Sequence, residues 1–424
     1  MREKLSYTLA DVPANLYLYL LAVTAIGFTI DGGIYSVLLN LYLLRLGYGP
    51  EFVGTVNSAG LLIFAAISLP IGSITRWSSR QLLILGMGIS FVGVAGLPLA
   101  EWFPPAWQAP LLIGMRMLGM VGLSFFFVHC APYLMGLTPD SWHSRALSWQ
   151  TAALSLAGFL GGVIGGLLPG WLGRLLDVSL SSPRPYQYPL MLAAVLLLPA
   201  IVALWWLPET AAADDDPAAS VHESERALSW QNGVWGIVGL VLIVRVLLMS
   251  GVGIVNTFTN VYFDDGLGMS TERIGWLTAL GRLFGIVVAL AIPYLVDRFG
   301  NYRLVIGITL LSAVGMMPIV LTGSEAVAGW AFVLVTALGA LRYLAFLVYA
   351  LSLVSTKRRS LMAGTAEMGI GFSFAAMAFL GGYMIVWYGY QVVFLGGALL
   401  MVLGVVAFWL LFQESPARPR RRGY

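Results

Sequence analysis

Two short stretches of this sequence, far apart along the chain, decide its fold. Leu46–Gly54 reads LGYGPEFVG, and Leu267–Gly275, which lies 221 positions later, reads LGMSTERIG. The same shift superposes residues 46–86 on 267–307 without a gap and keeps four glycines and one glutamate, in the pairs Gly47/Gly268, Glu51/Glu272, Gly54/Gly275, Gly60/Gly281 and Gly86/Gly307. Because these residues recur in one ungapped register, the sequence predicts two related halves.

The composition places both halves in a membrane. Of the 424 residues, 59% are hydrophobic and only 10% are charged, and the mean hydropathy is +0.86. Soluble domains have about 45–50% apolar and about 25% charged residues. Because this chain has too few polar side chains to cover a water-exposed surface, the composition excludes a soluble enzyme, a disordered protein and a nucleic-acid binder.

Long apolar runs predict the number of membrane spans. A spanning helix needs about 20 mostly apolar residues, whereas a barrel strand needs about ten that alternate. The chain has twelve runs, at 17–43, 52–74, 82–100, 108–135, 146–172, 187–207, 233–263, 271–296, 303–322, 328–354, 362–387 and 391–412. The predicted fold class is therefore all-α, with twelve transmembrane helices in two pseudo-symmetric six-helix bundles.

The charged residues outside these runs predict the domain limits and the orientation. We expect an N-terminal lobe at 1–207, a linker at 208–231, a C-terminal lobe at 232–412 and a basic tail at 413–424. With the N-terminus inside, fifteen Lys and Arg residues fall on the inner side and four on the outer side. This positive-inside imbalance predicts cytoplasmic N- and C-termini, and we expect the bacterial cytoplasmic membrane to be the location.

One loop carries a resemblance to a known family. Residues 293–303 read PYLVDRFGNYR, which resembles the G-x-x-x-D-R-x-G-R-R cytoplasmic loop of the major facilitator superfamily, with Pro in place of the first Gly. The equivalent stretch 72–81, GSITRWSSRQ, keeps the first Gly and Arg80 but has Arg76 in the Asp position. The resemblance implies a transporter that works by alternating access, with helices 1, 4, 7 and 10 around a central cavity.

Five charged residues lie well inside the predicted spans, where a charge costs several kcal/mol and is by default a functional candidate. Four of them fall on the helices that the resemblance places around the cavity, and Arg282 falls on helix 8. We predict a substrate and proton pathway made of Asp31, Arg116, Arg245, Arg342, Arg282, Asn256 and Tyr35. The five charges include four positive ones, and this excess favours an anionic substrate group bound by guanidinium.

Asp31 is the candidate proton carrier of this pathway. It precedes Gly32 and Gly33, which loosen a helix and let a ligand or another backbone approach. A neighbouring guanidinium favours the charged form of a carboxyl group, so a movement that separates Asp31 from Arg116 would change its protonation. The alternative is a permanent Asp31–Arg116 bridge that only holds two helices together.

Charged residues at the inner ends of the helices predict a cytoplasmic gate. Its candidate residues are Arg76, Arg80, Asp297, Arg298, Gly300, Arg145 and Glu367. We expect Arg76 to pair with Glu367 and Asp297 to lie beside Arg145. The alternative role of the two acids is helix capping, since negative charge at a helix N-terminus is favoured by about 0.3–1 kcal/mol.

A glycine-rich run predicts close helix packing. Gly158–Gly170 reads GFLGGVIGGLLPG, and small residues let membrane helices approach each other closely.

The function predicted from these features is proton-coupled export of a small amphiphilic or anionic organic molecule. The alternatives are uptake or facilitated transport of an anionic metabolite, flipping of a lysophospholipid-like lipid, and a non-transporting sensor. The sequence has no G-x-x-x-x-G-K-[ST] motif for ATP, and its three histidines and one cysteine offer no metal-ligand spacing or nucleophile set. We expect no enzyme activity, no cofactor and no nucleic-acid partner, and a monomer in the lipid bilayer.

Overall fold

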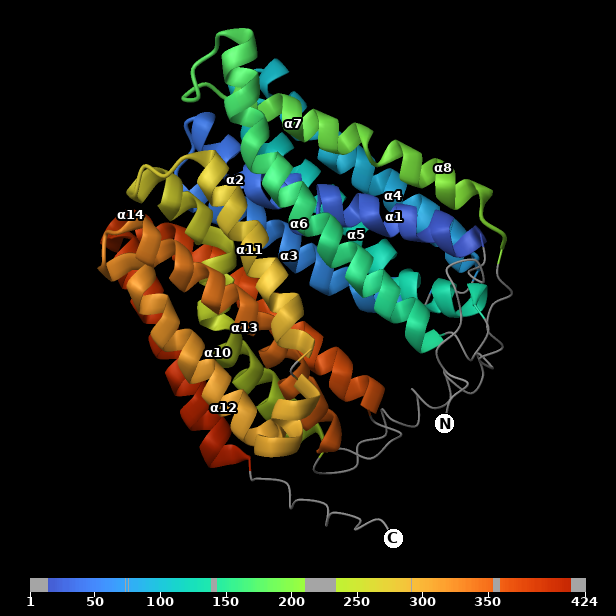
Figure 1. Cartoon of the computed structure of the whole chain (residues 1–424), viewed down its shortest axis with the longest axis vertical. Helices are drawn as coiled ribbons and strands as arrows, with labels where there is room; N and C mark the ends of the chain where they lie inside the picture. The colour runs from blue at the N-terminus through green and yellow to red at the C-terminus, as the bar shows by residue number, and fades with distance from the viewer. Residues whose placement is uncertain are drawn as a thin grey trace. The chain divides into compact units, whose positions relative to one another are not determined.

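The protein is built from α-helices. The computed structural model describes residues 14–72, 74, 76–138, 143–209, 234–290, 292–353 and 359–412, and this part of the chain contains no strand. Its helices are α1 Ala14–Thr29, α2 Ile34–Arg45, α3 Pro50–Gly72, α4 Ser79–Gly96, α5 Pro105–Leu137, α6 His143–Leu176, α7 Arg184–Val195, α8 Leu198–Trp206, α10 Val234–Val261, α11 Thr271–Leu290, α12 Ile292–Leu321, α13 Glu325–Ser352 and α14 Arg359–Leu411 (Figure 1). The predicted linker from residue 210 onward and the predicted tail lie outside the described residues.

Ten segments of the described residues are long and apolar enough to cross a membrane. These segments coincide with the predicted apolar runs, with two differences. Helix α11 is not among the ten segments, and the single segment Gly364–Leu411 covers two of the predicted runs. The missing α11 carries Glu272, Arg273 and Arg282, which lower its apolar character. The predicted all-α membrane fold is therefore confirmed, and the chain is a multi-pass integral membrane protein.

Two glycines mark boundaries where one long helix is really two. Gly300 lies inside α12 with φ 74° and ψ 156°, and Gly389 lies inside α14 with φ 80° and ψ 171°. A residue with a Cβ almost never adopts these angles. Each glycine therefore ends one helix and lets the next begin, and Gly300 does so within the predicted family loop.

The backbone supports the internal repeat. Gly47 and Gly268, which the shift of 221 superposes, both have positive φ, at 89° and 66°. Both stand in short connections, after α2 and before α11. The superposed glycines Gly60 and Gly281 both lie against a neighbouring helix, the first beside Arg116 and the second beside Thr336.

The described residues form two compact units. Unit 1 contains the described residues of 14–48, 55–209 and 270–279. Unit 2 contains 49–54, 234–269 and the described residues from 280 onward. Residues 49–54, which include the first turn of α3, belong to unit 2, and the first half of α11 belongs to unit 1. The lobe and linker limits stay predictions. Within unit 2 the core is a cluster of apolar side chains from α10, α12, α13 and α14, which includes Val244, Leu341, Phe346, Ala366 and Phe408.

Candidate functional site

The first span is broken at Asp31. Helix α1 ends at Thr29 and α2 begins at Ile34, and between them Gly32 has φ 84°. The hydroxyl of Ser36 accepts the N–H of Gly32 at 2.8 Å and donates to the carbonyl of Ile30 at 2.9 Å. The break therefore has its own hydrogen bonds, and it holds the half-buried Asp31 between two half-helices. The sequence predicted a loosened helix here, and the structure shows an interrupted one.

Glycines of α6 pack directly on this break. A Cβ on Gly161 would collide with the carbonyl of Phe28, and one on Gly165 would come within 2.9 Å of the Cα of Ile34. A Cβ on Gly162 would lie 3.2 Å from the carbonyl oxygen of Gly32. The close packing predicted from the glycine run is therefore confirmed, and α6 supports the segment that carries Asp31.

Arg116 on α5 donates to a side chain that the sequence analysis did not select. Its Nη2 donates to Oδ1 of Asn57 on α3 at 3.4 Å, and Nδ2 of Asn57 donates to Oδ1 of Asn40 on α2 at 2.8 Å. Gly60 leaves the space in which the side chain of Arg116 lies. This chain of polar groups connects α5, α3 and α2 inside unit 1.

Tyr35 belongs to the same polar region. Its hydroxyl donates to the carbonyl of Val94 at 2.8 Å, and its side chain lines one small cavity together with Ile30 and Arg116. Three of the residues predicted for the pathway, Asp31, Tyr35 and Arg116, thus lie around the helix break or the adjacent cavity. The specific pairing of Asp31 with Arg116 stays a prediction.

Unit 2 contains two fully buried arginines. Arg245 on α10 and Arg342 on α13 have exposed fractions of 0% and 1%. Nη1 of Arg342 donates to the hydroxyl of Ser312 on α12 at 2.8 Å. Among the described residues, no group accepts a hydrogen bond from Nε, Nη1 or Nη2 of Arg245 or from Nε of Arg342. Two cations are therefore held in the interior with most of their donors unpaired within the described chain.

Aromatic rings and one acid surround Arg245. Its guanidinium carbon lies 4.2 Å from the ring centre of Phe346 and 6.0 Å from that of Tyr343. The hydroxyl of Tyr343 donates to Oε1 of Glu367 on α14 at 2.6 Å. Glu367 is therefore held next to the ring that Arg245 faces, although the sequence analysis assigned Glu367 to the gate and not to the pathway.

Two pathway residues remain. Asn256 on α10 is exposed, and Arg282 on α11 is half-buried. Their place in the pathway stays a prediction.

Among the gate residues, Arg80 has the best-defined contacts. It donates from Nε to the carbonyl of Leu204 at 3.1 Å and from Nη2 to that of Trp205, and its Nη1 lies 4.0 Å from Oε1 of Glu209. Arg80 therefore holds the C-terminal end of α8. All of these contacts of Arg80 lie within unit 1.

The other gate residues stay predictions. Arg298 donates from Nη1 to the hydroxyl of Tyr294 at 3.1 Å, and Arg76 is exposed. The side chains of Asp297 and Arg145 lie outside the described residues. The pairs Arg76–Glu367 and Asp297–Arg145 stay predictions.

The sequence analysis did not select two residues of these clusters. Asn57 and Ser312 are uncharged polar residues in apolar runs, and each accepts a hydrogen bond from an arginine inside a span, Arg116 and Arg342 respectively. A lone Asn in the middle of a span was the available signal for Asn57. A serine is too common in membrane helices to single out Ser312.

The described residues contain no group of three or more His, Cys, Asp or Glu side chains that could hold a metal ion.

The fold and its broken, charge-bearing helices define a class of protein, the polytopic α-helical transporters. The family model described as Major Facilitator Superfamily matches residues 21–352. The chain belongs to the major facilitator superfamily, as the loop at 293–303 predicted.

Individual relatives are distant. The chain is 21% identical over 294 residues to multidrug resistance protein 2 of Bacillus subtilis (strain 168), across 64% of this chain and 69% of that one. It resembles a structure of a variant of the nucleoside transporter NupG, with a TM-score of 0.73, 15% identity, and 94% and 100% of the two chains covered. It also resembles the xylose transporter XylE from E. coli, with a TM-score of 0.71, 16% identity, and 95% and 97% coverage. At these identities the two structures establish the fold alone.

Proposed function

We propose that this transporter exports a small amphiphilic or anionic organic molecule in exchange for protons. Asp31 is the proposed proton carrier, and the observation that carries the proposal is its position in the break between α1 and α2. In secondary transporters, substrate and coupling-ion sites are typically formed by such discontinuous helices near the bilayer midplane.

Two further observations support this assignment. The polar chain of Arg116, Asn57 and Asn40 and the hydroxyl of Tyr35 place charged and polar groups next to the break. The sequence similarity to multidrug resistance protein 2 of Bacillus subtilis favours export of organic molecules over the uptake of one nutrient. In this proposal the gate residues, including Arg76 and Asp297, close the cytoplasmic side during the cycle.

The test is proton release from the purified full-length protein in detergent on addition of ethidium, an amphiphilic cation. If ethidium competes with a proton on Asp31, binding releases protons, and Asp31→Asn abolishes the release. A pH-sensitive dye measures the release, and ethidium fluorescence anisotropy measures binding in the same sample.

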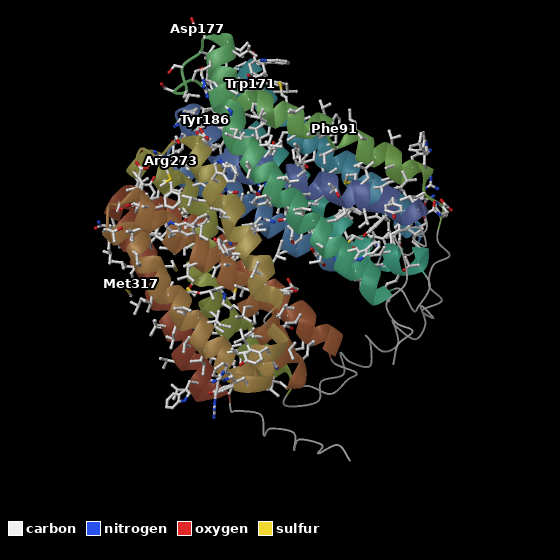
Figure 2. All side chains as sticks on the ribbon, viewed as in Figure 1. Phe91, Trp171, Asp177, Tyr186, Arg273 and Met317 are labelled. Atoms are coloured by element: carbon white, nitrogen blue, oxygen red, sulfur yellow. The ribbon has the colours of Figure 1, made fainter. Side chains whose placement is uncertain are left out.

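Asp177→Asn is the matched control. Asp177 follows α6 and is exposed beyond Trp171 (Figure 2), and its φ of 52° suits asparagine. The control should release protons as the wild type does. Release that persists in Asp31→Asn, or that is lost equally in Asp177→Asn, would contradict the assignment of Asp31.

A second candidate function is uptake or facilitated transport of an anionic metabolite without proton coupling. The buried pair Arg245 and Arg342 favours it, because two cations in an apolar interior suit an anionic cargo. Anion binding without proton release, unchanged in Asp31→Asn but lost in Arg342→Ala, would support this second function over the first.

A further inference from the structure

We propose that Arg245 and Arg342 form a binding site for the acidic group of a singly charged organic anion. The proposed function covers amphiphilic and anionic molecules. This proposal assigns a site to the anionic class alone, so it deepens the proposed function and rests on it. All the residues that build the site belong to unit 2, and they come from α10, α12, α13 and α14.

The first argument is the set of unpaired donors. Three side-chain nitrogens of Arg245 and one of Arg342 are buried. None of these four nitrogens has a hydrogen-bond acceptor among the described residues. A buried charge is unfavourable unless it is paired and hydrogen-bonded. A carboxylate suits these donors, because its two oxygens accept charge-assisted hydrogen bonds from guanidinium.

The second argument is the charge balance. Arg245 lies over the ring of Phe346, one helical turn after Arg342 on α13. Glu367 is hydrogen-bonded to Tyr343, whose ring also faces Arg245. Two positive charges and one negative charge leave an excess of one positive charge. A singly charged anion neutralises this excess, whereas a cation would increase it.

The third argument is the shape of the surroundings. The rings of Phe346 and Tyr343 flank the Arg245 guanidinium. A Cβ on Gly369 would come within 2.8 Å of the Arg245 side chain, so α14 closes the site from another direction. Rings that lie beside a cation provide an apolar and aromatic wall. The site therefore suits an anion whose acidic group is attached to an apolar or aromatic body.

The Tyr343–Glu367 pair lies on the exposed side of the site. Arg245 and Arg342 are fully buried, whereas Tyr343 is half-buried and Glu367 is exposed. The hydroxyl of Tyr343 donates to the carboxylate of Glu367 at 2.6 Å. The negative charge of Glu367 repels an anion that approaches Arg245. The charge of Glu367 therefore sets the affinity of the site.

The test compares benzoate with benzamide, which has the same ring but no charge. Isothermal titration calorimetry on the full-length protein in detergent measures both ligands. We expect wild type to bind benzoate and to bind benzamide at least about tenfold more weakly, the effect of losing one charge-assisted hydrogen bond. Equal affinities for the two ligands would overturn the proposal.

Substitutions of the two arginines and of Glu367 should change benzoate affinity in opposite directions. Arg245→Met and Arg342→Gln should each weaken benzoate binding about ten- to hundredfold. Glu367→Gln should strengthen it about three- to tenfold, because it removes a nearby negative charge. Arg174→Gln changes an exposed arginine of α6 and should leave benzoate affinity unchanged. Benzoate affinity that does not respond to the Arg245 and Arg342 variants would overturn the proposal.

Thermal unfolding without benzoate separates a binding role from a structural one. Because Arg245→Met replaces an unpaired buried cation by an apolar side chain of similar length, the variant should unfold at the same or a higher temperature. A lower unfolding temperature would mean that Arg245 stabilises the fold, and it would overturn the proposal. If Arg245→Met does not fold, the Glu367→Gln result decides: tighter benzoate binding supports the site, and unchanged or weaker binding overturns it.

The same variants separate this proposal from the proposed function. Ethidium-dependent proton release that requires Asp31, without benzoate binding at the two arginines, would overturn the anion site alone. Benzoate binding that requires Arg245 and Arg342, without proton release through Asp31, would overturn proton exchange alone.

Discussion

The hydroxyl of Tyr343 on α13 donates to the carboxylate of Glu367 on α14 at 2.6 Å, directly beside the buried Arg245. This bond connects two helices of unit 2 and places a carboxylate next to the tyrosine ring that Arg245 faces. Glu367 is thereby held by a neutral donor, and the guanidinium of Arg245 keeps its nitrogens unpaired among the described residues.

Tyr343→Phe should lower the free energy of unfolding by about 1 kcal/mol, since it removes one hydrogen bond to a partly exposed acid. Thermal unfolding in detergent measures the change. Glu367→Gln is the control, because the amide oxygen of glutamine can still accept the bond. Equal losses of stability in both variants would show that charge, and not the hydrogen bond, is the stabilising factor.

Gly161→Ala should destabilise the protein by about 1–3 kcal/mol, because the new methyl group would collide with the carbonyl of Phe28 at the broken span. Gly170→Ala, on the same helix, has open space around its added Cβ and should be neutral. Thermal unfolding of the two variants against wild type measures the difference. A neutral Gly161→Ala would contradict the close packing of α6 on the break.

Gly389→Ala should destabilise the protein by about 1–3 kcal/mol, because φ 80° and ψ 171° form a conformation that is essentially restricted to glycine. Gly396→Ala lies seven residues later in the helical part of α14, with no atom near its added Cβ. That control should be neutral or slightly stabilising, since alanine favours helix. Chemical denaturation in detergent distinguishes the two variants.

Arg80→Lys should lower the free energy of unfolding by about 1–2 kcal/mol, because lysine keeps the charge but loses the planar arrangement of donors that reaches two carbonyls of α8. Arg184→Lys, at an exposed position of α7, is the matched control and should be neutral. A stable Arg80→Lys that nevertheless loses transport would point to the predicted gate, and not to the end of α8, as the main role of Arg80.

Much of the fold was predictable from local sequence. Apolar runs predicted the spans, because a segment that crosses lipid must satisfy its own backbone hydrogen bonds and therefore forms a helix. The loop at 293–303 predicted the family. The boundaries were harder to predict: Gly300 and Gly389 end helices through backbone angles that their neighbours in sequence do not specify.

The candidate site was predictable in part. A charge inside an apolar run is conspicuous in the sequence, so Asp31, Arg116, Arg245 and Arg342 were identified. The partners of Arg116 and Arg342 were not predictable, because Asn57 and Ser312 lie on other helices. Hydrogen bonds between helices depend on which faces meet, and periodicity within one helix does not encode that.

By itself, the sequence determined that this protein is a duplicated, all-helical membrane protein, because hydropathy and the repeat are properties of the chain alone. Only the tertiary structure decided how the buried charges are arranged. It placed Asp31 in a break that α6 supports and enclosed Arg245 and Arg342 within one unit. The physical reason is that the energy of a buried charge depends on its neighbours in space, and those neighbours are brought together only by helix packing.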